Sequence, residues 1–330
     1  MRKHTTAFTT FFLLLLMFPL SVLAQKTVFV VESYHAEYAW DASYIKALQE
    51  TLGPRYKLEF FEMDTKRLPK DKHQKMSDLA WKKYLELKPD LVVLGDDAAL
   101  IHLVKRLAET RTPVVYLGIN NNPRDYVPPS AENFTGVLER PLLKRSIAFL
   151  QALIPAAKRI LILFDDDVTA QVIKKEVFSG RDSTVINGIT VEIRLIGTLK
   201  EYKEAVLSAK GQYDATVIGL YQSVKTPEGA AVDAEELISW VSRNSTVPPF
   251  AFWDFAVGAH RTAGGLVLYG REMGTLAAGL VKNILEDGTP PRNIIPVLNN
   301  QGVFLFSKSQ LKNWKLTLPK EILSSATLVD

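Results

Sequence analysis

The sequence predicts an α/β protein of two lobes, each built on a doubly wound parallel sheet. Short apolar runs of strand length alternate with amphipathic stretches of helix length, which is typical of parallel sheets covered by helices. The alternation breaks at residues 121–133, which hold three prolines and several turn formers, and then restarts. With 330 residues, 47% of them hydrophobic, the chain can bury two cores of ordinary size.

Residues 1–24 have the pattern of a targeting segment. Arg2 and Lys3 precede an apolar stretch at residues 11–20, and Val22-Leu23-Ala24 fits a small-residue cleavage site. We expect a signal peptide cleaved after Ala24, because the apolar stretch is short for a membrane span. An uncleaved anchor is the alternative.

Composition limits the class of protein further. The chain has no cysteine, which excludes a disulfide framework, thiolate metal sites and a lipid-anchored cysteine. We therefore expect a free monomer in the periplasm of a two-membrane bacterium. The formal charge of +4 falls to +2 when Arg2 and Lys3 leave, and the remaining charges are interspersed. This pattern disfavours nucleic-acid binding.

The first unit opens with an apolar run at residues 28–31, typical of a strand buried on both faces. A polar, aromatic loop follows. Asp41 is a plausible N-cap for the next helix, whose apolar stripe begins with Ile45 and Leu48. The later elements expected here are a strand at 56–63, a helix at 70–87, a strand at 91–94, a helix at 98–109, a strand at 113–117 and an extended crossing segment at 134–137.

The second unit repeats the alternation. We expect helices at 141–153, 168–178, 199–210 and 233–243, and strands at 159–164, 190–195, 215–220 and 249–253. A helix at 271–285 and strands at 294–298 and 303–306 then complete both lobes. The predicted division assigns 25–136 plus about 255–289 to the first lobe, and 137–254 plus about 290–330 to the second.

The candidate ligand site lies where the strands end, because open parallel sheets bind ligands beyond the carboxyl ends of their strands. Aromatic faces bury apolar area, while amides and carboxylates orient a ligand by hydrogen bonds. This mixture suits an amino acid, a sugar or a nucleoside-like molecule. The candidates are Tyr34, His35, Trp40, Asp96, Asp97, Asn120 and Asn121 from the first lobe, and Asp165, Asp166, Tyr221, Gln222, Trp253 and Asp254 from the second.

Each candidate also has a purely structural interpretation. The aromatic residues, including Tyr38 of the same loop, can pack across the top of the sheet. The aspartates at 96–97 and 165–167 precede predicted helices, where carboxylates cap the N-terminus. No pair of histidines has zinc-helix spacing, and the sequence lacks GxSxG and phosphate-loop motifs. We therefore expect no catalysis, no metal and no cofactor.

Three segments resemble a known family. Residues 133–163 contain Thr135-Gly136-Val137, then a helix ending in the turn at 154–158, then a strand. Residues 247–288 and the ending LKNWKLTLPKEILSSA are also similar. Together these segments resemble type I periplasmic solute-binding proteins, and more narrowly the ABC-transporter substrate-binding family that includes tryptophan and tyrosine binders. The resemblance covers nearly all of residues 27–326.

The resemblance implies a protein that closes two hinged lobes on a small solute and passes it to an ABC permease. The expected ligand loops depart from those of the aromatic amino-acid binders, so tryptophan and tyrosine are not carried over as ligands. Related modules serve histidine kinases, so a sensory role is the alternative. An exported hydrolase that uses the clustered carboxylates is a third.

Overall fold

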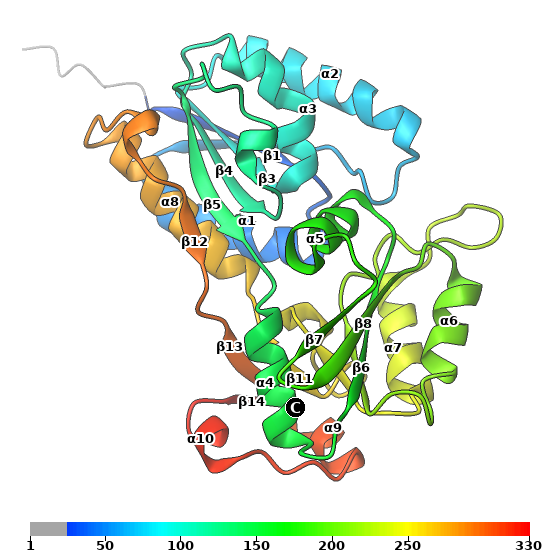
Figure 1. Ribbon diagram of the computed structural model, residues 1–330. Coiled ribbons are helices and arrows are strands. Elements are labelled where there is room, and N and C mark those ends of the chain that lie inside the picture. Colours follow the sequence, from blue (N-terminus) through cyan, green and yellow to red (C-terminus); the bar gives the residue numbers. More distant parts are fainter. Residues whose placement is uncertain (1–24) are drawn as a thin grey trace, which may run out of the picture.

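The computed structural model describes residues 25–330 of the chain, and the expected signal peptide with its cleavage point lies outside them. Two α/β lobes lie one above the other (Figure 1). This architecture confirms the predicted fold class. Within the described part of the chain, no helix is long and apolar enough to cross a membrane.

The first lobe is built on six parallel strands in the order β12-β5-β4-β3-β1-β2. Along β1, Val28 and Val30 belong to the core on one face, and Phe29 and Val31 to the core on the other. Burial on both faces explains why β1 is an unbroken apolar run. The strands are β1 (Thr27–Glu32), β2 (Lys57–Glu62), β3 (Leu91–Gly95), β4 (Val114–Ile119), β5 (Phe134–Glu139) and β12 (Val297–Asn299).

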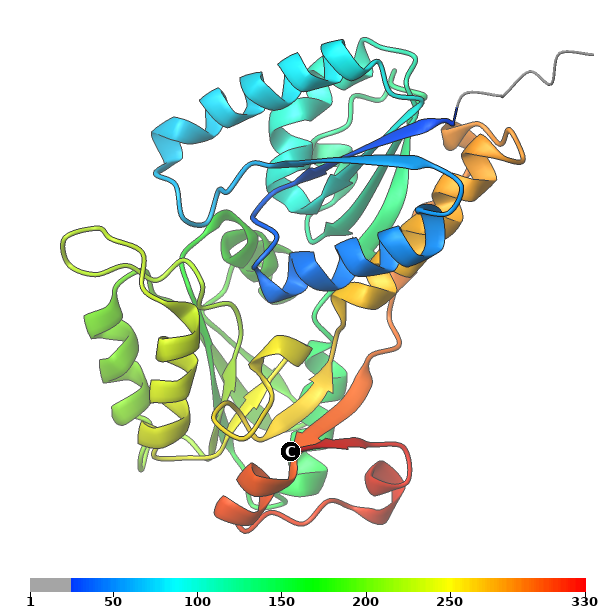
Figure 2. The same cartoon turned by 180° about the vertical axis from the view of Figure 1, so that it is seen from behind.

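Helices cover both faces of this sheet. Helices α1 and α8 lie side by side on one face, and α2 and α3 cover the other (Figure 2). The helix α1 begins after Tyr38, so Asp41 lies in its first turn and the prediction of Asp41 as N-cap is wrong. The bounds are α1 (Ala39–Leu52), α2 (Lys70–Leu87), α3 (Asp96–Ala108) and α8 (Gly270–Leu285).

The second lobe contains a five-stranded sheet in the order β10-β9-β6-β8-β7, with α6 and α7 on one face (Figure 1). A three-stranded sheet, β11-β13-β14, lies at its base with α9 and α10. The elements are α4 (Leu143–Leu153), β6 (Arg159–Phe164), α5 (Val168–Phe178), β7 (Ser183–Ile186), β8 (Ile189–Leu195), α6 (Leu199–Leu207), β9 (Ala215–Ile218), α7 (Ala234–Asn244), β10 (Pro249–Ala251), β11 (Gly264–Val267), β13 (Val303–Ser307), α9 (Lys308–Asn313), α10 (Lys320–Leu323) and β14 (Thr327–Val329).

The chain passes between the lobes three times. It crosses from β5 to α4, from β11 to α8, and from β12 to β13 (Figures 1 and 2). Short 3₁₀ helices occur at η1 (Pro123–Asp125), η2 (Asp254–Ala256) and η3 (Pro291–Asn293). Three adjacent connections form the predicted multi-strand hinge, a geometry that permits rigid-body closure of the lobes.

Strand pairing differs from the predicted segments in three places. The expected crossing at 134–137 is instead part of β5, where Gly136 is needed because a Cβ there would lie 2.1 Å from the Tyr116 carbonyl oxygen. Strand β12 pairs with β5, so residues 297–299 join the first sheet rather than the second lobe. Strand β11 pairs with β13 in the second lobe, although residues from about 255 were expected in the first. Such pairings join distant segments and leave no periodic pattern in the sequence.

A candidate ligand site between the lobes

A small cavity lies where the strand ends of the two lobes meet. Its volume is about 10 Å³, roughly the room that one water-sized group needs. Its lining comes from loops and helix starts of both lobes: Tyr34, Tyr38, Trp40, Asp96, Asn120, Glu139, Thr169, Leu220, Trp253 and Phe255. The lobes are therefore closed on each other in this structure, with a central polar and aromatic space between them.

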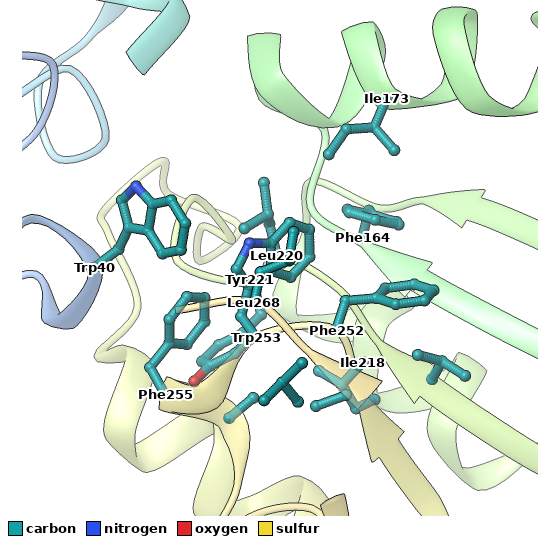
Figure 3. Close-up of a cluster of buried hydrophobic side chains, with 14 of the residues drawn as sticks. Trp40, Phe164, Ile173, Ile218, Leu220, Tyr221, Phe252, Trp253, Phe255 and Leu268 are labelled. Carbon is teal, nitrogen blue, oxygen red and sulfur yellow. The ribbon is translucent and has the colours of Figure 1, made fainter. Parts of the chain in front are cut away.

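Aromatic rings form most of the cavity wall. Trp40, at the start of α1, lies across from Trp253 and Phe255 of the second lobe (Figure 3). The Trp253 and Phe255 rings stack with centroids 6.2 Å apart, and Tyr38 lies 5.8 Å from Phe255. Tyr34 meets Tyr38 edge-on at 5.1 Å. Rings from both lobes thus surround a shared centre, which is suited to an apolar or cationic group.

Two buried carboxylates lie among these rings. Asp96 accepts a hydrogen bond from Trp40 Nε1 at 3.1 Å, and Glu139 accepts one from Trp253 Nε1 at 2.6 Å. Burial raises the pKa of Glu139 to about 8. Burial and the neighbouring Glu139 charge raise the pKa of Asp96 well above its ordinary value. Each carboxylate is held in place by an indole N–H.

Polar contacts join the two lobes around the cavity. Tyr34 Oη and Thr169 Oγ1 lie 3.0 Å apart, and the Trp253–Glu139 bond also crosses between the lobes. Lys66 Nζ lies 3.7 Å from an Asp167 carboxylate oxygen, and both side chains are shielded from solvent. These contacts would break when the lobes open, so they set part of the balance between open and closed forms.

A wider groove forms the mouth of the site. Its volume is about 420 Å³, and Tyr38 and Phe255 line both this groove and the inner cavity. The groove and the inner cavity therefore share part of their lining. The remaining lining residues of the groove are His35, Glu37, Ala39, Arg67, Tyr221, Gln222, Ala231, Val232, Asp233, Ala234 and Glu235.

The sequence profile of the family described as "ABC transporter substrate binding protein" matches residues 64–330, most of the chain. The chain belongs to this family. It is accordingly a solute-binding component of an ABC transporter, with a small-molecule ligand and an ABC permease as the partners that the family implies. Proteins of this family are typically periplasmic or extracellular, and the family gives no support to the alternative sensory role.

Solved structures show the same fold. An ABC domain protein in complex with L-Trp from Streptococcus pneumoniae is 17% identical, with a TM-score of 0.67 over 93% of this chain and 100% of that one. A conserved domain protein from Vibrio cholerae is 17% identical, with a TM-score of 0.66 over 93% of this chain and 100% of that one. A ligand-free, open substrate-binding protein with adhesive properties from Clostridium difficile is 14% identical, with a TM-score of 0.61 over 92% of this chain and 99% of that one. No curated protein sequence matches the chain.

Eight of the predicted residues lie on the cavity or its mouth. Five line the inner cavity of this substrate-binding protein: Tyr34, Trp40, Asp96, Asn120 and Trp253. Three line the groove outside it: His35, Tyr221 and Gln222. The strand-end rule brings these residues together because the two sheets point their carboxyl ends at each other.

Five other candidates are not among the lining residues. Asp97 accepts the backbone N–H groups of Asn120 and Asn121, and Asn121 is itself buried beside it. Asp165 accepts the backbone N–H of Ser223 at 3.0 Å. Asp166 is exposed, and Asp254 begins η2. Asp97 and Asp165 thus brace loops that carry the site.

The capping interpretation holds for the position of Asp167 but not for Asp96 and Asp97. Helix α3 follows Gly95 as N-cap, so Asp96 and Asp97 lie inside its first turn. Asp167 is the N-cap of α5 but makes no side-chain capping bond. Across residues 25–330, no group of three or more His, Cys, Asp or Glu side chains is placed to hold a metal ion.

Sequence reasoning missed Glu139, Lys66, Thr169 and Phe255. Glu139 is the last residue of β5, a strand end by the same rule that selected Asp96, but residues 134–137 had been interpreted as a crossing. Thr169 lies in the first turn of α5. Lys66 comes from the loop between β2 and α2 and reaches the other lobe. Its role depends on a contact between the lobes that no local pattern reveals.

Proposed function

We propose that this protein is exported and captures a small polar or aromatic solute between its two lobes for an ABC permease. The cavity lined from both lobes is the observation that carries the proposal, because a solute held there contacts both halves and stabilises the closed form. Trp40 from the first lobe and Trp253 from the second would lie against the solute. The carboxylates and Asn120 would orient it.

Capture requires the lobes to open. The cavity of about 10 Å³ is too small for a whole solute. Opening about the three-connection hinge would separate Tyr34 from Thr169 and Lys66 from Asp167, and would join the inner cavity with the mouth groove. The solute would then restore part of those contacts as the lobes close around it.

Export is part of the same proposal. We propose that residues 1–24 direct the chain across the inner membrane and that the mature protein works in the periplasm. A solute-binding component has to meet its solute on the outer side of the permease. Secretion of the intact gene product, followed by N-terminal sequencing, would give Gln25 as the first residue if cleavage follows Ala24.

A thermal-shift screen over amino acids, amines, sugars and nucleosides tests capture directly. A solute present at 100 times its dissociation constant adds about 2.7 kcal/mol to the free energy of unfolding. The L-Trp complex of a protein with the same fold makes amino acids a natural part of the panel. Failure of every solute class to raise the melting temperature would contradict the proposal.

Replacing Trp253 tests whether the cavity is the site. Trp253→Ala removes a ring on the cavity wall and its bond to Glu139, so we expect the affinity for the solute to fall at least tenfold. Trp253→Phe keeps most of the packing, loses the N–H donor and should give a smaller loss. Isothermal titration calorimetry measures both.

Trp81→Phe is the matched control, because Trp81 lies on α2, stacked on Tyr84 and away from the cavity. Its affinity should equal that of the unmodified protein. Unchanged affinity in both Trp253 variants, with their folds intact by circular dichroism, would remove the cavity from the proposal.

A further inference from the structure

We propose that the captured solute is a primary amine whose ammonium group sits between Asp96, Glu139 and Asn120. The inference rests on the proposed function and names the chemical class of its solute. It is carried by the inner cavity, which combines aromatic walls with the oxygens of Asp96, Glu139 and Asn120, the last of which has no hydrogen-bond partner among the described residues. The mouth groove would then hold the rest of the molecule.

Several polar groups of the cavity can accept a hydrogen bond from a ligand. Trp40 and Trp253 have already given their indole N–H groups to Asp96 and Glu139, so these donors are not free for a ligand. Tyr34 Oη and Thr169 Oγ1 are paired with each other. Each carboxylate keeps further lone pairs after its indole bond. The remaining lone pairs of these two carboxyl groups can accept hydrogen bonds from a ligand that brings donors.

The side chain of Asn120 carries a buried acceptor oxygen that has no hydrogen-bond donor among the described residues. This side chain is 1% exposed and lines the cavity. The amide Nδ2 donates to the Gly118 carbonyl at 3.3 Å, whereas Oδ1 has no hydrogen-bond partner among the described residues. A buried acceptor without a partner costs free energy that a ligand donor would recover. With Asp96 and Glu139 it makes three acceptor groups, which match the three N–H bonds of a primary ammonium.

The charge of the surroundings also favours a cation. Among residues 25–330, no Lys, Arg or His lines the inner cavity. Arg140 donates to the carbonyls of Ile119, Glu139 and Asn121. Lys66 lies behind the Tyr34 ring, with its Nζ 3.7 Å from Asp167. A ligand carboxylate beside the amine would face the buried Asp96 and Glu139, so a zwitterionic amino acid is disfavoured in the inner cavity.

The aromatic walls suit an ammonium group. Lys66 shows this chemistry within the protein itself, because its Nζ lies 4.4 Å from the centroid of the Tyr34 ring and 5.5 Å from that of Tyr38. Trp253 and Phe255 present a second pair of rings on the opposite lobe. Ring faces attract cations by their quadrupole, and desolvation strengthens the attraction.

The size and direction of the cavity complete the assignment. A space of about 10 Å³ fits an ammonium head without its substituent. Tyr38 and Phe255 continue from the inner cavity into the groove of about 420 Å³. The chain or ring that carries the amine would pass between these two residues toward the mouth.

Matched pairs of probes test the ammonium assignment by calorimetry on the full mature protein. Tryptamine is compared with L-tryptophan, tyramine with L-tyrosine, and putrescine with 1,4-butanediol. Within at least one pair, the amine should bind tenfold or more tightly than its partner, since charge-assisted hydrogen bonds to buried carboxylates are lost or opposed in the partner.

Isosteric variants then locate the ammonium. Asp96→Asn and Glu139→Gln keep an oxygen acceptor for the indole bonds but remove the charge, so each should weaken amine binding tenfold or more. Asp287→Asn makes the same chemical change at an exposed residue just after α8 and should leave the affinity unchanged. Melting temperatures of all three variants show whether each is folded.

Three outcomes are distinct. Amine preference that is lost in Asp96→Asn and Glu139→Gln supports the inference. Tighter binding of an amino acid or a neutral solute, abolished by Trp253→Ala, overturns the inference and leaves the proposed function standing. No binding by any probe or by any member of the wider solute screen overturns both.

Discussion

Asp96 adopts a backbone conformation that few residues other than glycine adopt, with φ at +68°. Its carboxylate is buried, holds the Trp40 indole and packs above Gly118, where a Cβ would approach it to 3.3 Å. Strained residues of this kind persist where the surroundings over-determine them, and they gather at binding sites. The positive φ at Asp96 fits its position on the cavity.

Glu139 makes the stability of the protein depend on pH. Burial raises its pKa from 4.5 to about 8, and the Asp97 charge adds to that rise. Trp253, Asn120 and Arg140 act in the opposite direction. The folded protein therefore holds a proton that the unfolded chain releases. The stabilisation is fully present below about pH 4.5 and is lost as pH rises to about 8. We expect the free energy of unfolding in urea to fall across this window.

In Glu139→Gln that fall should be shallower, because the amide does not titrate. It should not vanish, since burial also raises the pKa of Glu32 to about 7 and that of Asp97 to about 6. Identical pH profiles for the variant and the unmodified protein would show that Glu139 is ionised in the closed form. The raised pKa of this carboxyl in the closed form would then be contradicted.

Among the elements, the pair α1 and α8 positions one wall of the site. Helix α8 starts against Trp40, where a Cβ on Gly270 would lie 2.6 Å from the Trp40 carbonyl oxygen. One turn later, a Cβ on Gly274 would lie 2.4 Å from the Tyr44 carbonyl oxygen and 2.9 Å from the Ala47 Cβ. The two glycines let α8 lie directly on α1, which carries Trp40 into the cavity.

Gly274→Ala should destabilise the protein by roughly 1–3 kcal/mol, the usual cost of forcing extra atoms into a packed contact. Gly279→Ala, on the same helix, meets nothing within 4 Å and should stabilise it by up to about 1 kcal/mol through helix propensity. Urea denaturation measures both. An equal effect of the two substitutions would contradict the close packing of α1 on α8.

Local patterns predicted most elements, and the failures have physical reasons. The apolar run at β1 and the stripe on α2 are visible in the sequence because each depends on burial of its own residues. Strand β7 was missed although Asn187 and Gly188, with φ of 51° and 78°, form the tight turn that joins it to β8. The β5–β12 pairing joins residues about 160 positions apart, beyond the reach of any local pattern.

The candidate site was predictable only in part, for the same reason. Tyr34, Trp40, Asp96, Asn120 and Trp253 follow strands, so the strand-end rule found them without knowledge of the other lobe. Glu139 was hidden by the wrong assignment of β5. The partnership of Lys66 with Asp167 exists only when the two lobes meet.

At the scale of the whole molecule, closure is the property on which the function depends. The closed form brings Trp40 and Tyr34 of one lobe against Trp253 and Thr169 of the other, and it buries two carboxylates that repel each other. The cost of burying these carboxyl groups opposes closure, and a bound cation would lower that cost. The lobes would thus close most firmly when the right solute is present, which is the behaviour an ABC permease needs in order to recognise a loaded partner.

A crystal structure of the protein with the solute recovered from the thermal-shift screen tests the central claim most directly. The account predicts electron density for the solute between Trp40 and Trp253, in contact with both lobes and with Asp96, Glu139 and Asn120. Density for the solute on a single lobe or on the outer surface, with the inner cavity still closed, would contradict it.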